Sequence, residues 1–411
     1  MKILIILISL IIIGGLAHYS GKLAEHIKLP SLIGMMIVGM LMGPAFLNFI
    51  PEATLNLAPT LKDIALVAVL FIGGLGISLA QMKQIGRPAV LLSAIPATLE
   101  GFTIAFVSMW LLNFTFLQGA ILGFIIAAVS PAVLIPSMID LIHRHVGQDK
   151  AIPQMLLVGA SADDTIAITL FTTFLGIYMQ RVSGESISVP MQLFMIPITL
   201  ILSIGVGFLA FKISKPLIKL VSNCHLKVMI AFGICLLMRY LEKYFYIEIF
   251  NSLLTVMIYG FFLRNYLMDS SKIILDQMNE IWKIGKLYLF AFVGMAINPT
   301  LVGQFFLIGL GILSISLFVR SIGVILSLIG TNLSYKERIF CIIAYLPKAT
   351  VQSAKAAIPM QMGVAGGEIM QAIAILSVLI TAPIGAIGIR LTSDRFLHTE
   401  NPKGLSQNQT Y

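Results

Sequence analysis

Long apolar runs separated by short polar segments dominate the chain. Each run holds about 17 to 25 mostly apolar residues and ends at a charge, a proline or an asparagine cluster. An α-helix of about 20 such residues crosses a hydrocarbon core of about 30 Å with every backbone polar group paired inside the helix. The pattern predicts thirteen transmembrane spans, at residues 3–20, 29–47, 60–81, 88–113, 116–140, 152–180, 188–213, 226–244, 247–266, 282–302, 304–330, 338–360 and 364–390.

The composition supports this interpretation and excludes an ordinary soluble enzyme. Of the 411 residues, 58% are hydrophobic and 11% are charged, whereas soluble domains hold about 45 to 50% apolar and about 25% charged residues. We expect an all-α polytopic membrane protein with one membrane unit at 1–393 and a short polar tail at 394–411. The three cysteines predict no disulfide framework and no metal site. Glycine-rich phosphate loops are absent, and we expect no cofactor. The 27 Lys and Arg against 18 Asp and Glu are expected to be loop charges that orient the helices, and no nucleic-acid partner is expected.

Lysine and arginine gather on one side of the predicted membrane unit. Loops after odd-numbered spans, together with the tail, hold nineteen basic residues, and the opposite loops hold five. Cytoplasmic loops carry the excess of Lys and Arg in membrane proteins. The sequence therefore predicts an outside N-terminus, a cytoplasmic C-terminus, and a multi-pass protein in the lipid of the cell (inner) membrane.

Two parts of the chain resemble each other at a nearly constant offset. Three matches lie 220 or 221 residues apart: 31–39 with 252–260, 74–78 with 294–298, and Glu100 with Arg320. Because the second copy is displaced by seven spans, an odd number, it is inverted in the membrane. The prediction is a five-plus-five inverted repeat at about 29–180 and 247–390, joined by connecting helices at 188–244. Carriers built in this way bind substrate where the copies meet, although chance similarity between apolar helices is the alternative.

The fifth and twelfth spans both carry proline and hydroxyl residues in mid-membrane. These are Ser130 and Pro131 in the first copy, and Pro347, Lys348 and Thr350 in the second. Proline removes a helical hydrogen bond, and a broken helix at membrane depth is tolerated only beside protein or a watery cavity. The freed backbone ends can bind ions. We therefore expect two crossed discontinuous helices at a substrate site, with a pair of plain proline kinks as the alternative.

Six ionisable residues lie well inside predicted spans, at a cost of about 2.5 to 3.5 kcal/mol each on insertion scales. They are Glu100, Asp163, Asp164, Arg320, Lys348 and Lys355. Such charges are functional candidates by default, and a salt-bridge lock is the structural alternative. Glu100 and Arg320 occupy equivalent repeat positions with opposite charges, so we predict an ion pair between them.

The adjacent Asp163 and Asp164 are the candidate ion and proton ligands. Neighbouring helical residues diverge by about 100°, so one carboxylate can face a cavity while the other faces a partner. Two close carboxylates in a low dielectric favour alternate occupancy by a proton or a small hard cation. A purely structural network around both side chains is the alternative.

These residues resemble the monovalent cation:proton antiporter superfamily over essentially the whole chain. Asp163-Asp164 after a proline-interrupted span, together with the string Leu-Pro-Lys-Ala-Thr-Val-Gln at 346–352, is most similar to the double-aspartate branch and its NHA-type sodium/proton antiporters. The resemblance implies the sodium/proton antiporter fold, with a core domain, a dimerisation domain, a homodimer and elevator-like alternating access. It implies exchange of Na⁺ or Li⁺, and in some members K⁺, for protons, with Asp164 as the principal ion ligand.

Two positions within the family pattern bear on stoichiometry and ion identity. An electrogenic subgroup pairs the first aspartate with a lysine, whereas here the basic residue is Arg320, as in NHA-type and electroneutral members, with Glu100 as its counterpart. Relatives often carry Thr-Asp-Pro in the first crossing helix, whereas Val129-Ser130-Pro131 lacks the acid and so one possible cation ligand. A sodium-coupled organic-solute symporter of similar inverted-repeat fold remains the alternative, and a potassium efflux system would normally carry soluble regulatory domains.

Overall fold

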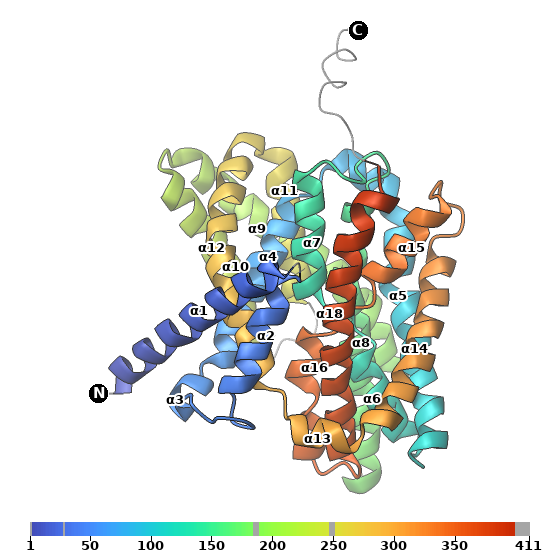
Figure 1. The fold of residues 1–411 in the computed structure, drawn as a ribbon. Helices are drawn as coiled ribbons and strands as arrows, with labels where there is room; N and C mark the ends of the chain where they lie inside the picture. The colour runs from blue at the N-terminus through green and yellow to red at the C-terminus, as the bar shows by residue number, and fades with distance from the viewer. Residues whose placement is uncertain (1, 28, 184–188, 246–250, 399–411) are drawn as a thin grey trace.

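The computed structural model describes residues 2–27, 29–183, 189–245 and 251–398, which form eighteen helices and no strand (Figure 1). The helices are α1 (Lys2–His26), α2 (Ser31–Met42), α3 (Glu52–Leu55), α4 (Ala58–Leu75), α5 (Leu79–Leu111), α6 (Phe116–Ile126), α7 (Pro131–His143), α8 (Ile152–Ser183), α9 (Val189–Leu220), α10 (Cys224–Tyr244), α11 (Ser252–Tyr266), α12 (Met268–Met295), α13 (Pro299–Gln304), α14 (Phe306–Ser327), α15 (Tyr335–Ala344), α16 (Thr350–Lys355), α17 (Ile358–Gln361) and α18 (Gly367–Phe396).

The thirteen predicted spans all correspond to helices in this architecture. Among the described residues, nine helical segments are long and apolar enough to cross a membrane. The other four predicted spans fall on α2, α11, α12 and the pair α15 and α16, which are short, rich in charge or interrupted. The span predicted at 282–302 falls on α12, whose helix begins at Met268 with an amphipathic stretch and ends at Met295.

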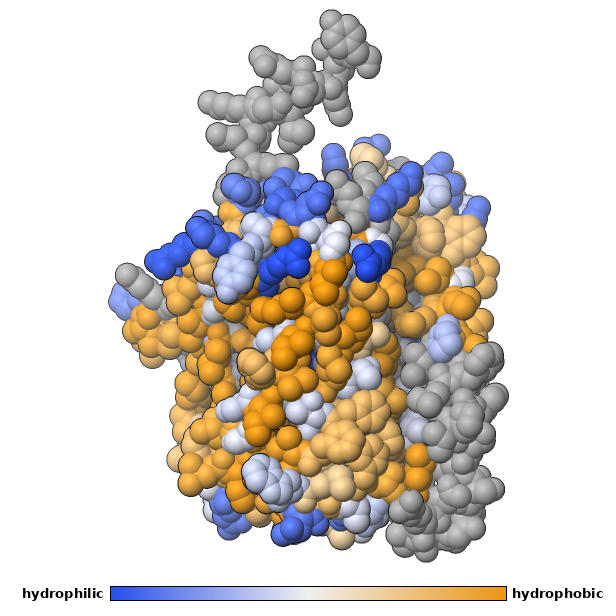
Figure 2. Space-filling model, turned by 90° about the vertical axis from the view of Figure 1, so that its right-hand side faces the viewer, coloured by the Kyte–Doolittle hydropathy of each residue, from blue (hydrophilic) through white to orange (hydrophobic). Residues whose placement is uncertain are grey.

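The surface has the layered polarity of a protein embedded in a bilayer. Figure 2 shows an apolar belt between two hydrophilic bands on the face that it displays. Large apolar side chains such as Trp110 and Phe318 are 79% and 69% exposed, which in water would leave extensive apolar surface unburied. The belt is the surface that lipid would cover.

The helices pack in two groups. We call α1 to α4 and α9 to α12 the scaffold, and α5 to α8 and α13 to α18 the core, because the helices of each group pack mainly on one another. The groups meet where α4 contacts α7 and where α8 contacts α9 and α11. We call the side on which α18 ends the C-terminal face and the opposite side the α3 face (Figure 1).

Two glycines show the repeat symmetry inside the scaffold. A Cβ atom at Gly74 in α4 would lie 2.0 Å from the Met257 carbonyl oxygen of α11, and one at Gly294 in α12 would lie 2.1 Å from the Met36 carbonyl oxygen of α2. The two glycines are 220 residues apart, and the two methionines are 221 apart. The same close helix contact is therefore made twice by equivalent positions, and only glycine permits it.

Candidate functional site

Two interrupted helices meet at the centre of the core. Residues 127–130 separate α6 from α7, and residues 345–349 separate α15 from α16. Pro131 stands at the first position of α7, where its missing amide hydrogen removes no helical bond. The amide of Ser130 donates to the carbonyl oxygen of Pro347 at 2.8 Å. The two breaks therefore contact each other directly, and the helices cross at this point.

One amide side chain satisfies the carbonyl end of α6. Gln352 Nε2 lies 3.1, 3.0 and 2.9 Å from the carbonyl oxygens of Ile125, Ile126 and Ala128. Helix ends in a buried position require such partners because their last carbonyls have none inside the helix. Sequence reasoning assigned no role to Gln352, although a long polar side chain just beyond a predicted helix break was a usable signal.

Three charged side chains, from α5, α14 and the break between α15 and α16, form a buried cluster beside the crossing. Arg320 of α14 donates from Nη1 to Glu100 Oε2 of α5 at 2.5 Å, and Lys348 Nζ donates to the same oxygen at 2.6 Å. Both cations also bind the carbonyl oxygen of Ala127, at 2.6 and 3.1 Å. The structure thus brings Glu100 and Arg320 together and adds Lys348, for which the sequence had suggested only a position among carbonyl ends.

Asp163 and Asp164 of α8 lie on different sides of the same helix turn. Asp163 Oδ2 accepts the amide hydrogen of Val129 at 2.7 Å and lies 3.7 Å from Arg320 Nη2. It therefore contacts the unwound segment that leads into α7 and also faces the charged cluster. A carboxylate is favourable near a helix N-terminus, where amide hydrogens are unpaired.

Asp164 points into a cavity between the core and the scaffold. The cavity has a volume of about 450 Å³ and is also lined by Leu66 of α4, Leu289 of α12 and Thr350 of α16. Asp164 is buried, and its Oδ1 atom has no hydrogen-bond partner among the described residues; the same holds for Thr350 Oγ1. Unpartnered carboxylate and hydroxyl oxygens are the ligands that hard cations prefer.

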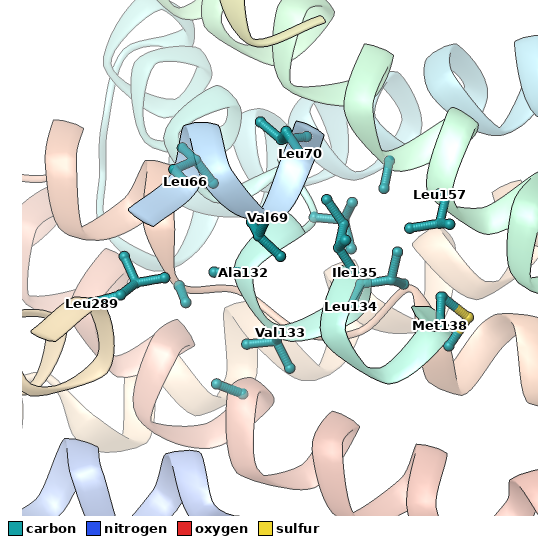
Figure 3. Packing of buried hydrophobic residues seen from close by; sticks show 14 of the residues in the cluster. Leu66, Val69, Leu70, Ala132, Val133, Leu134, Ile135, Met138, Leu157 and Leu289 are labelled. Carbon is teal, nitrogen blue, oxygen red and sulfur yellow. The ribbon is translucent and has the colours of Figure 1, made fainter. Parts of the chain in front are cut away.

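A second cavity opens toward the C-terminal face. It has a volume of about 610 Å³, and Ala132 and Val133 of α7 form part of its wall. Between the two cavities lies an apolar layer in which Leu66, Val69, Ala132, Val133 and Leu289 pack closely (Figure 3). Asp164 lines the cavity at the α3 face and not the one at the C-terminal face.

The described residues contain no group of three or more His, Cys, Asp or Glu side chains that could hold a metal ion. A resident metal centre of the usual kind would require such a group.

Comparisons with known proteins match this architecture to a family of transporters. The family described as "Sodium/hydrogen exchanger, transmembrane" matches residues 3–393. Human sodium/hydrogen exchanger 9B2 is 30% identical over 96% of this chain and 74% of its own length, and mouse sodium/hydrogen exchanger 9B1 is 28% identical over 95% and 71%. The structure of the sodium proton antiporter MjNhaP1 from Methanocaldococcus jannaschii at pH 8 has a TM-score of 0.77, with 20% identity, over 96% of this chain and 99% of that chain.

The fold and the family together define a multi-pass membrane transporter of the cation:proton antiporter class, and not an enzyme. The chain belongs to the sodium/hydrogen exchanger family.

Proposed function

We propose that the protein exchanges Na⁺ or Li⁺ for protons, with Asp164 as the ligand that both ions share. One observation carries the proposal. Asp164 is a buried carboxylate that lines a cavity between two groups of helices, next to the helix crossing, and one of its oxygens has no partner. A carboxylate in this position gains from binding either a proton or a cation, because an unpaired charge in a low dielectric is costly.

If a proton and a cation compete for the Asp164 carboxylate, this competition is sufficient for exchange. A bound cation favours the ionised form of Asp164, and a bound proton excludes the cation. Asp163 assists from the next helix position, where it contacts the Val129 amide and faces Arg320. The protons of two such close carboxylates belong to the pair, and Arg320 releases none at accessible pH.

Alternating access requires that Asp164 be exposed to one side at a time. Asp164 belongs to the core, and the cavity that it lines has a scaffold wall on the opposite side. The apolar layer that contains Val69 and Val133 separates it from the second cavity (Figure 3). We propose that the core moves against the scaffold, so that this layer opens as the cavity at the α3 face closes.

The test is proton flux in proteoliposomes, with Na⁺, Li⁺ and K⁺ offered in turn at clamped voltage. We expect cation-dependent proton flux with the wild type and none with Asp164→Asn. Asp149→Asn is the matched control, since Asp149 lines a separate cavity with Lys83 and Arg87. Retained exchange in Asp164→Asn would refute the assignment. Sodium uptake that depends on an added organic solute would instead favour a sodium-coupled symporter.

We further propose that the C-terminal face is cytoplasmic and that the protein forms a homodimer in the bilayer. Cys224 provides a native probe of orientation, because it is exposed at the start of α10 while Cys235 and Cys341 are buried. A membrane-impermeant maleimide should label Cys224 from the cytoplasmic side alone. Single-molecule photobleaching of labelled protein in lipid should give two steps, and a single step would refute the dimer.

A further inference from the structure

The mouth of the cavity at the α3 face carries a network of charges whose carboxylates are already occupied. Asp63 of α4 pairs with Arg239 of α10 at 3.1 Å and with Lys243 of the same helix. Glu242 pairs with Arg239 and accepts a hydrogen bond from the hydroxyl of Ser252. The carboxylates of Asp63 and Glu242 therefore already pair with cations of the scaffold, and little negative charge remains for other groups at the mouth.

Two lysines at the same mouth lack such partners. Lys62 of the scaffold and Lys355 of the core line the cavity that contains Asp164, and neither forms an ion pair within 4 Å among the described residues. Lys355 is within electrostatic range of the cations Arg239 and Lys243 and also of the carboxylates of Asp63 and Glu242, which already pair with those cations.

The described residues of this mouth thus carry a cationic excess. The cavity is lined by the cations Lys62, Arg239, Lys243 and Lys355 and by the carboxylates of Asp63 and of Asp164 itself. Glu242 adds one carboxylate beside the wall, where it pairs with Arg239. Any cation that approaches Asp164 from the α3 face passes these side chains.

The described residues at the mouth of the cavity at the C-terminal face are more nearly balanced in charge, although the loops on that side hold nineteen of the basic residues counted in the sequence. The cavity wall contains the cations Arg144, Lys286 and Arg390 and the carboxylates of Glu25 and Asp140. Outside the wall, Asp394 pairs with Arg144. The mouths of the two cavities therefore differ in charge. A single apolar layer separates the two cavities.

We infer that Lys62 and Lys355 form an electrostatic barrier that lowers the local concentration of cations at the α3 face, and so set a lower apparent cation affinity from this face than from the other. The inference rests on the proposed exchange at Asp164. A mouth lined by one sign of charge changes local ion concentration and association rate, and salt screens the effect. Lys355 thus determines on which side the transporter loads its cation most readily, without touching the bound ion.

The experiment measures the apparent KM for Na⁺ or Li⁺ from each face, in vesicles of known orientation. Lys355→Gln should lower the KM at the α3 face by about two- to tenfold, as expected for one charge about 10 Å away at an effective dielectric constant of about 25 to 80. Lys355→Glu should lower it further, and Lys62→Gln should act like Lys355→Gln. The KM at the C-terminal face and the rate at saturating cation should stay unchanged.

Two controls separate the barrier from a general effect on the protein. Lys355→Arg keeps the charge and should keep the wild-type KM, and Lys83→Gln removes an exposed lysine outside both cavities. The effect of Lys355→Gln should disappear at an ionic strength of about 1 M, where the Debye length is about 3 Å. An unchanged KM at low ionic strength in both glutamine variants, or an equal change at both faces, overturns the inference. If the wild type shows no cation-dependent proton flux at all, the proposed function fails and the barrier with it.

Discussion

The charged cluster at the helix crossing and the carboxylate of Asp164 are equally buried but differ in their partners. Glu100 receives hydrogen bonds from two cations, Arg320 and Lys348. Asp164 lines a cavity and has no ion pair among the described residues, although each of the two carboxylates has one oxygen without a hydrogen-bond partner. Burial alone therefore does not separate a structural charge from a binding site, whereas the presence of a paired cation does.

The largest expected difference between the two regions concerns transport. Asp164→Asn should reduce exchange to the leak of empty vesicles and leave the melting temperature equal to or above that of the wild type, because it removes an unpaired buried charge. Glu100→Gln should lower both transport and melting temperature. Thermal unfolding in detergent, measured beside the flux assay, checks this. A strong loss of stability in Asp164→Asn would show that its carboxylate is part of the structural network after all.

The cluster itself can be tested by a double-mutant cycle. Removing one partner of a buried ion pair costs about 3 to 5 kcal/mol because the other charge stays buried and unpaired. Glu100→Gln and Arg320→Gln should each be strongly destabilising, while the double variant should lose clearly less than the sum of the two. Additive losses would mean that the side chains do not interact in the membrane. Lys348 stays in place throughout and can partly compensate Glu100 in the Arg320 variant, so this variant should be the milder.

Asp163 lies between the two regions and should show an intermediate effect. Asn at this position keeps an oxygen for the Val129 amide but loses the negative charge that faces Arg320. Asp163→Asn should therefore fold, transport more slowly and show a displaced pH profile, whereas Asp163→Glu should retain part of the activity. The measurement is exchange rate against pH in proteoliposomes. An Asp163→Asn profile that superimposes on the wild-type profile would exclude Asp163 from the titrating pair.

The smallest expected effect concerns the stability that an ion pair at the edge of the membrane contributes. Glu337 accepts two hydrogen bonds from Lys150 Nζ, at 2.9 and 2.8 Å, and also binds Ser334. Burial alone would raise the pKa of Glu337, but the hydrogen bonds from Lys150 and Ser334 hold this pKa below its ordinary value. The pair therefore stabilises the fold above the pKa that Glu337 has in the unfolded chain, and the contribution is lost as the pH falls through the lower folded pKa.

This contribution can be isolated by comparing melting temperatures between about pH 7 and about pH 4. Wild type should lose slightly more stability on acidification than Glu337→Gln, in which no carboxyl group titrates at this position. Lys150→Gln should lower the melting temperature modestly at neutral pH. Equal acid sensitivity of wild type and Glu337→Gln would show that the pair contributes nothing measurable.

The sequence predicts the fold well because every span in a bilayer must pair its backbone polar groups within its own helix. The offset between Gly74 and Gly294 and the prolines at 131 and 347 predict the inverted copies and the two helix breaks, and the structural match confirms this fold. The sequence predicts the pairing of Glu100 with Arg320 but does not predict that Lys348 binds the same carboxylate. Glu100 binds Lys348 as well as Arg320 only because the crossing brings residues 248 positions apart to within 2.6 Å.

The sequence also does not predict which residues share a cavity. That Lys355 shares a cavity with Asp164 depends on the approach of α16 to α4 and α10, which no periodicity reports. Sequence analysis placed this lysine only among the six ionisable residues inside predicted spans. In the structure it lines the mouth without an ion pair among the described residues, because the nearby carboxylates of Asp63 and Glu242 already bind Arg239 and Lys243.

The hydrogen bond between the Ser130 amide and the Pro347 carbonyl has a consequence for the mechanics of transport. Each helix break has lost the ladder of bonds that keeps a helix straight, and would by itself be a natural hinge. Here a hydrogen bond joins the two breaks, and the Gln352 side chain also binds the carbonyl end of α6. Neither interrupted helix can therefore bend alone. In the proposed movement of the core, the crossing should therefore move as one rigid unit, and the ion site should keep its geometry during transport.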